Sequence, residues 1–297
     1  MSENWDTILD TFNRFLVRRK RPQTVDTYMY IVRKFVEFCK ERGLGPNDVK
    51  PMDVELFYDR LTGISDRSLY TYSYGLNSFF KFIGLTKLVD TIIVPTFEVK
   101  ETPYLLENEV MDLIDKIDDL KFKCLYLSMY ECALRVSEAL NLNWSDFNPD
   151  MLSLRVKRLK SKRRIVSSKP ISRKLVRMLN ELKQKYIDEG LEITDDTPIF
   201  ITYSKKRGGY GRMTRQYAEK KFREYAKKYG IDKIVKNRGF EKATTHILRH
   251  SRITDIALKT NGDLTVMQKV SDHQNPANLT IYTHIAGKII REKLGVK

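Results

Sequence analysis

The chain has 297 residues, a length that allows two domains with separate hydrophobic cores. It carries 54 Lys and Arg against 38 Asp and Glu, and the net charge of +16 favours a polyanionic partner, above all nucleic acid. A membrane partner is disfavoured, because no apolar run is long enough to span a bilayer and the first residues lack a signal-peptide profile.

Apolar residues recur at helical spacing along the first 85 residues. The pattern predicts a helix from Trp5 to Leu16 and a second from about Thr24 to Gly43. It predicts a third helix after Pro51 and a fourth that ends at Gly84. We therefore expect a four-helix N-terminal domain over residues 1–85.

Residues 86–103 have a different composition. Residues 91–97 are β-prone and are interrupted by Pro95, and Pro103 closes the segment. We interpret residues 86–103 as a linker between the first domain and a second domain over residues 104–297.

The second domain mixes helices with a few short strands. Helices are predicted over 107–118, 122–132 and 172–187, and helices fill the chain after residue 212. Strands are predicted over 152–157, 164–168 and 198–201, with a basic turn at 158–163 and a Gly-rich basic loop at 205–212. The predicted fold is mainly α with a small antiparallel β-sheet in this domain.

The three cysteines, Cys39, Cys124 and Cys132, form no CxxC pair, which argues against disulfides and against a zinc–thiolate site. They lie in apolar helical stretches, so we expect packed thiols in a reducing compartment. The predicted location is the cytoplasm, in association with the nucleoid, or the host cytoplasm for a viral or plasmid gene.

All four histidines lie in the last fifth of the chain. His246 and Arg249 are three residues apart and share a helix face, which places a proton carrier beside a permanent cation. A phosphodiester requires this combination. Two alternatives are a zinc site at His246 and His250, although Ile247 stands where the metalloprotease motif needs Glu, and ordinary helix histidines with hydrogen-bond partners.

Arg135 interrupts a strongly apolar stretch. A buried guanidinium needs an anion, and Glu138, three residues on, can supply it. The pair is either structural, or Glu138 braces an arginine that faces a cleft and awaits a phosphate.

Four motifs in this order resemble those of the tyrosine recombinase family, within it the Xer-like and the phage or archaeal integrases. They are Arg135 in Ala-Leu-Arg-Val-Ser-Glu-Ala-Leu, His246-x-x-Arg249-His250, His273, and Tyr282 in Ile-Tyr-Thr-His. Residues 1–85 resemble the family's core-binding domain, and the stretch from Pro103 resembles the start of its catalytic domain. The resemblance implies a two-domain clamp on double-stranded DNA recombination sites.

The resemblance also implies a mechanism. Tyr282 attacks the scissile phosphate and forms a 3′-phosphotyrosine, while Arg135 and Arg249 hold the non-bridging oxygens. A 5′-hydroxyl from a partner strand then attacks the phosphotyrosine. Because bond energy is conserved and two guanidiniums stabilise the charge, we expect no cofactor and no metal.

The same resemblance assigns roles in proton transfer and hydrogen bonding to three further residues. His246 exchanges the tyrosine proton, His273 donates a hydrogen bond to the phosphate, and Lys160 protonates the leaving 5′-oxygen. His250 is expected to orient its helix rather than perform chemistry.

Three stretches depart from the family's pattern, and one of them, residues 234–241, resembles an insertion before His246. The turn at 158–163 lacks the usual Gly-Lys-Gly, so Lys160 is favoured from its spacing to Arg164, with Lys157 and Lys162 as alternatives. Ser271-Asp272-His273 stands where the family usually has Leu-Gly-His.

We expect monomers in solution and a homotetramer on paired DNA sites. Residues 285–294 are predicted to form a short amphipathic helix that packs on its own domain or on a neighbour. Three functions compete with recombination: a type IB topoisomerase, which rejoins the same strand; a non-catalytic DNA-binding accessory protein; and a metal-dependent nuclease.

Overall fold

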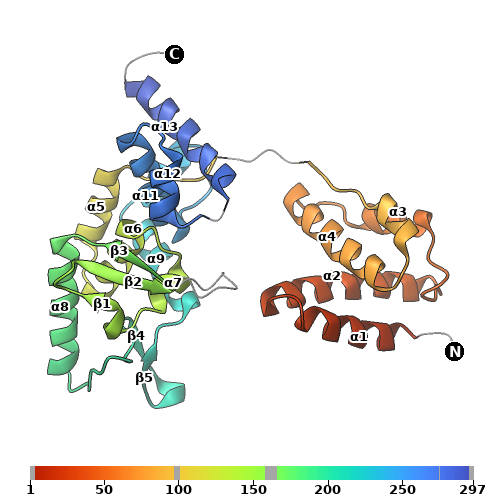
Figure 1. Cartoon of the computed structure of the whole chain (residues 1–297), viewed down its shortest axis with the longest axis horizontal. Helices are drawn as coiled ribbons and strands as arrows, with labels where there is room; N and C mark the ends of the chain where they lie inside the picture. Colours follow the sequence, from red (N-terminus) through yellow and green to blue (C-terminus); the bar gives the residue numbers. More distant parts are fainter. Residues whose placement is uncertain (1–3, 97–100, 158–165, 274, 294–297) are drawn as a thin grey trace. The chain divides into compact units, whose positions relative to one another are not determined.

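The computed structural model describes residues 4–96, 101–157, 166–273 and 275–293. The chain divides into two compact units, Met1–Val99 and Lys100–Lys297 (Figure 1). Helices predominate in both units, and the two antiparallel sheets of the described residues lie in the second unit. The predicted fold class is confirmed.

Unit 1 contains the four predicted helices, and their starts follow local signals. The side chain of Asn4 accepts a hydrogen bond from the backbone N–H of Asp6, and Ser65 caps the fourth helix in the same way. Pro22 and Pro51 occupy the first turn of the second and third helices. The helices are α1 (Trp5–Val17), α2 (Pro22–Glu41), α3 (Pro51–Arg60) and α4 (Asp66–Phe82).

Aromatic rings fill the core of unit 1. Phe35 lies at the centre, with ring centroids 5.2 Å from those of Phe57 and Phe80, both in edge-to-face geometry. Phe12 of α1 contacts Phe79 of α4 in the same manner, at 5.1 Å. These rings give unit 1 a core of its own.

The segment predicted as a linker begins with folded residues. Thr86–Thr91 form the 3₁₀ helix η1, which packs against α3 and α4, and Leu88 is buried there. Residues 92–96 form neither helix nor strand. The division between the two units, after Val99, lies within the predicted segment 86–103.

A three-stranded antiparallel sheet and a separate hairpin make up the β structure of unit 2. In the sheet, β1 (Phe147–Asn148) pairs with β2 (Ser153–Lys157), and β2 pairs with β3 (Val166–Pro170). The register places Leu154 opposite Lys169. The basic turn between β2 and β3 lies outside the described residues.

The second hairpin corrects one prediction. β4 (Ile201–Ser204) pairs with β5 (Gly209–Arg212) through the short 3₁₀ turn η3 (Lys205–Arg207). The predicted loop at 205–212 is therefore wrong over its last four residues, which form a strand. The glycines in this stretch favoured the prediction of a loop. In the structure, Gly208, with φ at +65°, forms the turn that joins the two strands.

Helix α11 (His246–Lys259) of unit 2 is largely buried and packs against helices from both earlier and later parts of the unit. The other helices of the unit are α5 (Glu107–Lys116), α6 (Leu120–Glu131), α7 (Val136–Leu140), η2 (Trp144–Asp146), α8 (Arg173–Asp188), α9 (Arg215–Lys228), α10 (Ile231–Asn237), α12 (Leu264–Ser271), η4 (Pro276–Leu279) and α13 (Thr280–Lys293). α11 contacts α5, α6, α12 and α13. Elements far apart in the sequence thus meet on its faces (Figure 1).

The last helix begins earlier than predicted. The sequence pattern places it at 285–294, after Tyr282, whereas α13 starts at Thr280 and includes Tyr282 in its first turn. Ile285 and Ile289 of α13 are buried against Tyr104, so the helix packs on its own unit.

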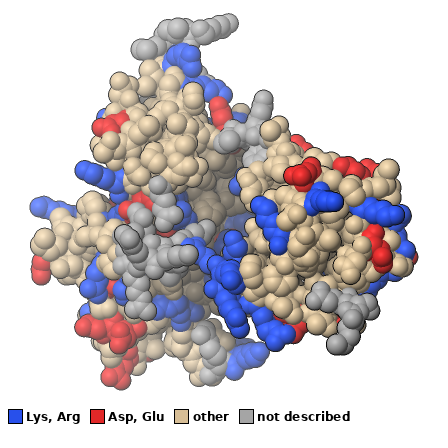
Figure 2. All heavy atoms as spheres, turned by 45° about the vertical axis from the view of Figure 1, so that its right-hand side comes forward, with Lys and Arg blue, Asp and Glu red and all other residues tan. Residues whose placement is uncertain are grey.

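Three other predictions concern burial and surface. The three cysteines are buried and free, as expected of packed thiols. Among the described residues, no helix has the length and apolar character needed to cross a membrane. Figure 2 shows Lys and Arg side chains spread over the surface of both units, with Asp and Glu in smaller groups.

Candidate active site

Helix α11 carries three of the singled-out side chains in its first two turns. His246, Arg249 and His250 lie at positions i, i+3 and i+4, so the helix places them on one face. Ile247 and Leu248 between them are fully buried and fix the helix against the core. Helical spacing in the sequence therefore brings these three side chains together, and the packing of α11 determines how far they are buried.

Arg249 is the buried centre of the site. Its side chain is 4% exposed, and its guanidinium donates to the carbonyl of Ala133 and, at 2.7 Å, to the carbonyl of Ser271. Burial lowers the pKa of Arg249 to about 10, so the group stays charged at neutral pH. Arg249 thereby ties the loop before Arg135 to the turn before His273.

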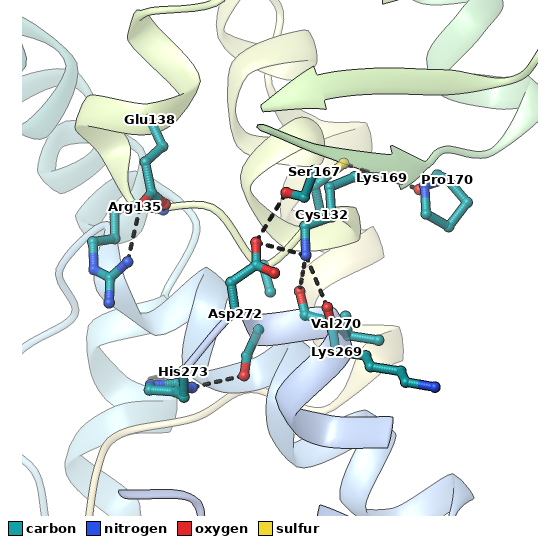
Figure 3. Close-up of polar contacts among 12 residues, drawn as sticks. Cys132, Arg135, Glu138, Ser167, Lys169, Pro170, Lys269, Val270, Asp272 and His273 are labelled. Atoms are coloured by element: carbon teal, nitrogen blue, oxygen red, sulfur yellow. Dashed lines mark hydrogen bonds and ion pairs between the residues drawn. The ribbon is translucent and has the colours of Figure 1, made fainter. Parts of the chain in front are cut away.

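Arg135 stands at the start of α7 and is paired as predicted. Its Nη1 donates to Glu138 Oε1 at 2.9 Å, and its backbone N–H donates to Glu138 Oε2 at 2.8 Å (Figure 3). Glu138 is buried, whereas the Arg135 side chain is 27% exposed. The carboxylate also lies 3.9 Å from Arg249 Nη1, so one anion braces both arginines.

Tyr282 projects from α13 into this cluster and is only 3% exposed. Its hydroxyl lies 2.5 Å from Nδ1 of His250, within hydrogen-bond distance. Burial raises the pKa of Tyr282 to about 12, against the lowering effects of Arg249, the Thr102 hydroxyl and Arg135. The tyrosine is therefore protonated and needs a base before it can act as a nucleophile.

His250 contacts the Tyr282 hydroxyl. Burial lowers its pKa to about 3, and the charges of His246, Arg249 and His273 act in the same direction. The ring is neutral at pH 7, and its Nδ1 can accept the hydrogen bond from the Tyr282 hydroxyl. The geometry thus gives His250 a direct contact with Tyr282 that the sequence pattern did not predict.

The shifted pKa makes stability depend on pH. Because the folded pKa of about 3 lies below the ordinary 6.5, the unfolded chain binds more protons between these values. The free energy of unfolding should therefore be highest above pH 6.5 and fall as the pH drops towards 3. From pH 7 to pH 5 the contribution of His250 to that loss is about 2 kcal/mol.

Urea unfolding at pH 7 and pH 5 tests this contribution. In a Trp5→Phe background, Trp144 becomes the only tryptophan and reports on unit 2. His250→Gln should reduce the difference between the two pH values by about 2 kcal/mol. His284→Gln, at an exposed position of α13, is the control and should leave the difference unchanged. An unaltered difference in His250→Gln would show that the ring titrates normally in the folded chain.

His273 follows the end of α12 and is held by Ser271. Nδ1 of His273 lies 2.7 Å from Ser271 Oγ, and the Ser271 hydroxyl donates to the carbonyl of Met267. The hydroxyl hydrogen is thus used, so His273 Nδ1–H is the donor in the first contact. With that proton on Nδ1, Nε2 donates a hydrogen bond only when the ring is an imidazolium.

His246 lies one helical turn before His250, with 6.3 Å between the ring centroids. Burial lowers its pKa, as do the charges of Arg215, Arg249 and Arg135. Within the described ranges, Tyr282 has a hydrogen bond with His250 and none with His246. The same ranges hold no group of three His, Cys, Asp or Glu side chains that could bind a metal ion.

The lysine candidates fall into two groups. Lys160 and Lys162 lie outside the described residues, so their placement in the site stays a prediction. Lys157 is exposed on β2, and its ammonium lies 3.3 Å from Asp146 Oδ1, which Arg155 also approaches at 3.2 Å.

Arg212, at the end of the stretch predicted as a Gly-rich basic loop, is turned inward. It donates to the carbonyl of Leu140 at 2.5 Å and to the side chain of Asn143 at 2.6 Å. This arginine therefore stabilises the segment after α7 rather than an exposed basic loop.

The chain is similar in sequence to a known protein family and to known recombinases. The model of the phage integrase family matches residues 103–288. The chain is 28% identical to tyrosine recombinase XerA of Pyrococcus horikoshii over 291 residues, which cover 97% of this chain and 92% of that protein.

Two solved structures have a similar fold. One is XerH recombinase bound to its difH substrate after cleavage, with a TM-score of 0.74, 19% identity and coverage of 97% of this chain and 83% of that one. The other is a lambda integrase tetramer bound to a Holliday junction, with a TM-score of 0.66, 17% identity and coverage of 93% and 79%. Since the family model covers well over half of the chain, the predicted resemblance is confirmed, and the chain belongs to the phage integrase family as a Xer-like tyrosine recombinase.

Proposed function

We propose that the chain recombines double-stranded DNA at specific sites, with Tyr282 as the nucleophile. The Tyr282 hydroxyl attacks the scissile phosphorus, a 3′-phosphotyrosine bond forms, and the bond to the 5′-oxygen breaks. A 5′-hydroxyl of a partner strand then attacks the phosphotyrosine and restores the Tyr282 hydroxyl. One phosphodiester is lost and one is gained, so the exchange needs no external energy source.

One observation carries this proposal: the hydroxyl of Tyr282 meets a neutral histidine beside a buried arginine. Arg249 and Arg135 both lower the pKa of Tyr282, so both cations act on the oxygen that would attack. Segments near residues 135, 249, 273 and 282 converge on this point because α11 packs against α6, α12 and α13. This is the constellation that nucleophilic catalysis on a phosphodiester requires.

The two arginines are proposed to hold the non-bridging oxygens of the phosphate. Arg135 is partly exposed and braced by Glu138, so its outer edge can receive a phosphate. Arg249 donates to two carbonyls and is proposed to reach the phosphate with its remaining N–H groups. His273 is proposed to donate from Nε2 as an imidazolium.

Protons must move at both ends of the reaction. His250 is proposed to orient the Tyr282 hydroxyl as a hydrogen-bond acceptor, because its Nδ1 contacts the hydroxyl and burial disfavours a charged ring. His246, one turn away, is proposed to exchange the Tyr282 proton with solvent. The leaving 5′-oxygen takes a proton from a lysine of the β2–β3 turn, for which Lys160 remains our choice.

DNA binding is proposed to involve both units. In unit 1, Arg18 and Arg19 are exposed at the end of α1, beside a hollow of about 470 Å³ that Arg14, Phe15 and Phe82 also line. Such basic surfaces contact phosphates without reading sequence, and their affinity falls as salt rises. A DNA substrate would place the enzyme at the nucleoid.

We also propose that the active assembly is a homotetramer on two paired sites, formed from monomers. Strand exchange between two duplexes needs four cuts, and each chain supplies one Tyr282. The similarity to a lambda integrase that forms a tetramer on a Holliday junction supports this stoichiometry.

The test starts by identifying the DNA site. DNA that remains linked to the protein after denaturation should be sequenced, and two copies of that site should be placed on one supercoiled plasmid. We expect recombinant circles that contain one site each. A topoisomerase would relax the plasmid without exchanging sites, a DNA-binding accessory protein would leave it uncut, and a metal-dependent nuclease would stop in EDTA. Recombination that persists in EDTA excludes all three.

A further inference from the structure

Lys169 is a buried cation that the proposed chemistry does not use. It lies on β3 with a side chain only 5% exposed, although lysine is rarely buried without a partner. Its ammonium lies 2.9 Å from Asp272 Oδ2 and donates to the carbonyls of Val270 at 2.7 Å and Lys269 at 3.1 Å. All three partners belong to the end of α12 or the residue after it (Figure 3).

Asp272 has an unusual backbone. Its φ of +56° places it in the left-handed region, where an L-residue with a β-carbon is normally disfavoured. Two contacts of its carboxylate offset this cost: it pairs with Lys169 and accepts a hydrogen bond from Ser167 Oγ at 3.1 Å. Two residues of β3 thus hold a strained residue that immediately precedes His273.

The end of α12 is held from two sides. Helix ends leave carbonyl groups without partners, and cations are favoured there. Lys169 donates hydrogen bonds to the carbonyls of residues 269 and 270, and Arg249 donates one to the carbonyl of Ser271. The same Ser271 binds His273 Nδ1 through its hydroxyl. Displacement of this helix end would therefore displace the His273 ring.

We infer that Lys169 and Asp272 form a positioning pair for His273: they fix the turn after α12 to strand β3 so that the imidazole is held in place for the phosphate. Neither residue touches the reacting atoms. This role rests on the function proposed above for His273. It differs from a purely stabilising role, because a buried ion pair often contributes little to stability when both charges are desolvated.

Single-turnover cleavage measures the pair's effect on the reaction. The assay uses the full chain in excess over a nicked duplex that carries its own site, and the covalent adduct is followed on a denaturing gel. Lys169→Met should slow adduct formation about tenfold, because a small displacement of a catalytic group is costly. Asp272→Asn should have a similar effect, and the double variant should be no slower than the slower single variant.

The decisive comparison is made in a His273→Gln background. If Lys169 acts through His273, Lys169→Met should change the residual rate there by less than about twofold. Selective ¹⁵N labelling of the four histidines adds a direct reading: Lys169→Met should shift the ring signals of His273 and leave those of exposed His284 in place. DNA affinity should stay within about threefold of the wild-type value.

Two control variants separate positioning from stability. Lys174→Met removes a lysine that pairs with Asp115 on the surface of the same unit, and the adduct rate should be unchanged. Leu179→Ala creates a cavity in the core beneath α8, so it lowers the melting temperature without touching α12. Its adduct rate should equal that of the wild type below its melting range.

Asp272→Gly provides the strictest test. Glycine adopts the left-handed backbone freely, so this variant keeps the turn but removes the carboxylate. Slow cleavage supports the pair, and a wild-type rate overturns the inference. Equal slowing by Lys169→Met with and without His273 also overturns it and leaves the proposed function intact. A fully active His273→Gln contradicts the role proposed for His273 and so overturns the inference, whereas a wild-type chain that forms no adduct contradicts the proposed function itself.

Discussion

Replacing Tyr282 with phenylalanine is expected to abolish the covalent protein–DNA adduct, with a loss of at least about 10⁴-fold in adduct formation. Phenylalanine fills the same buried space but lacks the oxygen that attacks the phosphate. The hydroxyl also takes part in the hydrogen bond with His250 Nδ1, and its loss should cost about 1 kcal/mol of stability. Affinity for the DNA site should remain within about threefold of the wild-type value.

A matched tyrosine controls for the loss of a buried hydroxyl. Tyr186 is 4% exposed, and its hydroxyl donates to the carbonyl of Ile199 at 3.2 Å, away from Tyr282. Tyr186→Phe should form the adduct at the normal rate on a nicked substrate. If Tyr282→Phe still becomes linked to DNA, another residue is the nucleophile. Mapping the linked peptide by mass spectrometry would then identify that residue.

Arg249→Lys is expected to have the second largest effect. The substitution keeps the charge, but an ammonium on a flexible stem cannot reproduce the planar fork that reaches the carbonyls of Ala133 and Ser271 together. One of these buried carbonyls should lose its partner, at a cost of about 2 kcal/mol in the free energy of unfolding. Adduct formation should fall by at least about 100-fold, because the loops of Arg135 and His273 both lose their common anchor.

Arg212→Lys is the matched control for this substitution. Arg212 also donates to backbone carbonyls within unit 2, and burial likewise lowers its pKa. Its replacement should cost stability but change the rate of adduct formation by less than about threefold. Equal losses of activity in the two variants would indicate that Arg249 acts only through the stability of the fold. Urea unfolding and single-turnover cleavage, measured on the same preparations, distinguish the two results.

Arg249 has two roles, one electrostatic and one structural, and a sequence motif cannot distinguish them. As a cation it stabilises charge near Tyr282, whose pKa it lowers. As a donor it joins the carbonyl of Ala133, a residue with φ at +50°, to that of Ser271, which directly precedes Asp272 with φ at +56°. Non-glycine residues hold such conformations only when their surroundings enforce them. Arg249 therefore helps to fix the loops that present Arg135 and His273.

The amino-acid sequence by itself determined the parts that depend on local order. Helical periodicity predicted the four helices of unit 1, and the order of Arg135, His246, Arg249, His273 and Tyr282 predicted the family. The pairing of Arg135 with Glu138 also followed from local spacing, since residues three apart on a helix turn are neighbours.

Only the tertiary structure decided which distant groups touch. The contact of His250 with Tyr282 joins two helices, and the pair of Lys169 with Asp272 joins a strand to a helix end more than 100 residues later. Neither contact has a periodicity or a fixed spacing that a sequence could reveal, because each arises from how α11, α12, α13 and β3 pack. Packing also buries Tyr282 and His250, and this burial shifts their pKa values in opposite directions, so that both groups are neutral at pH 7.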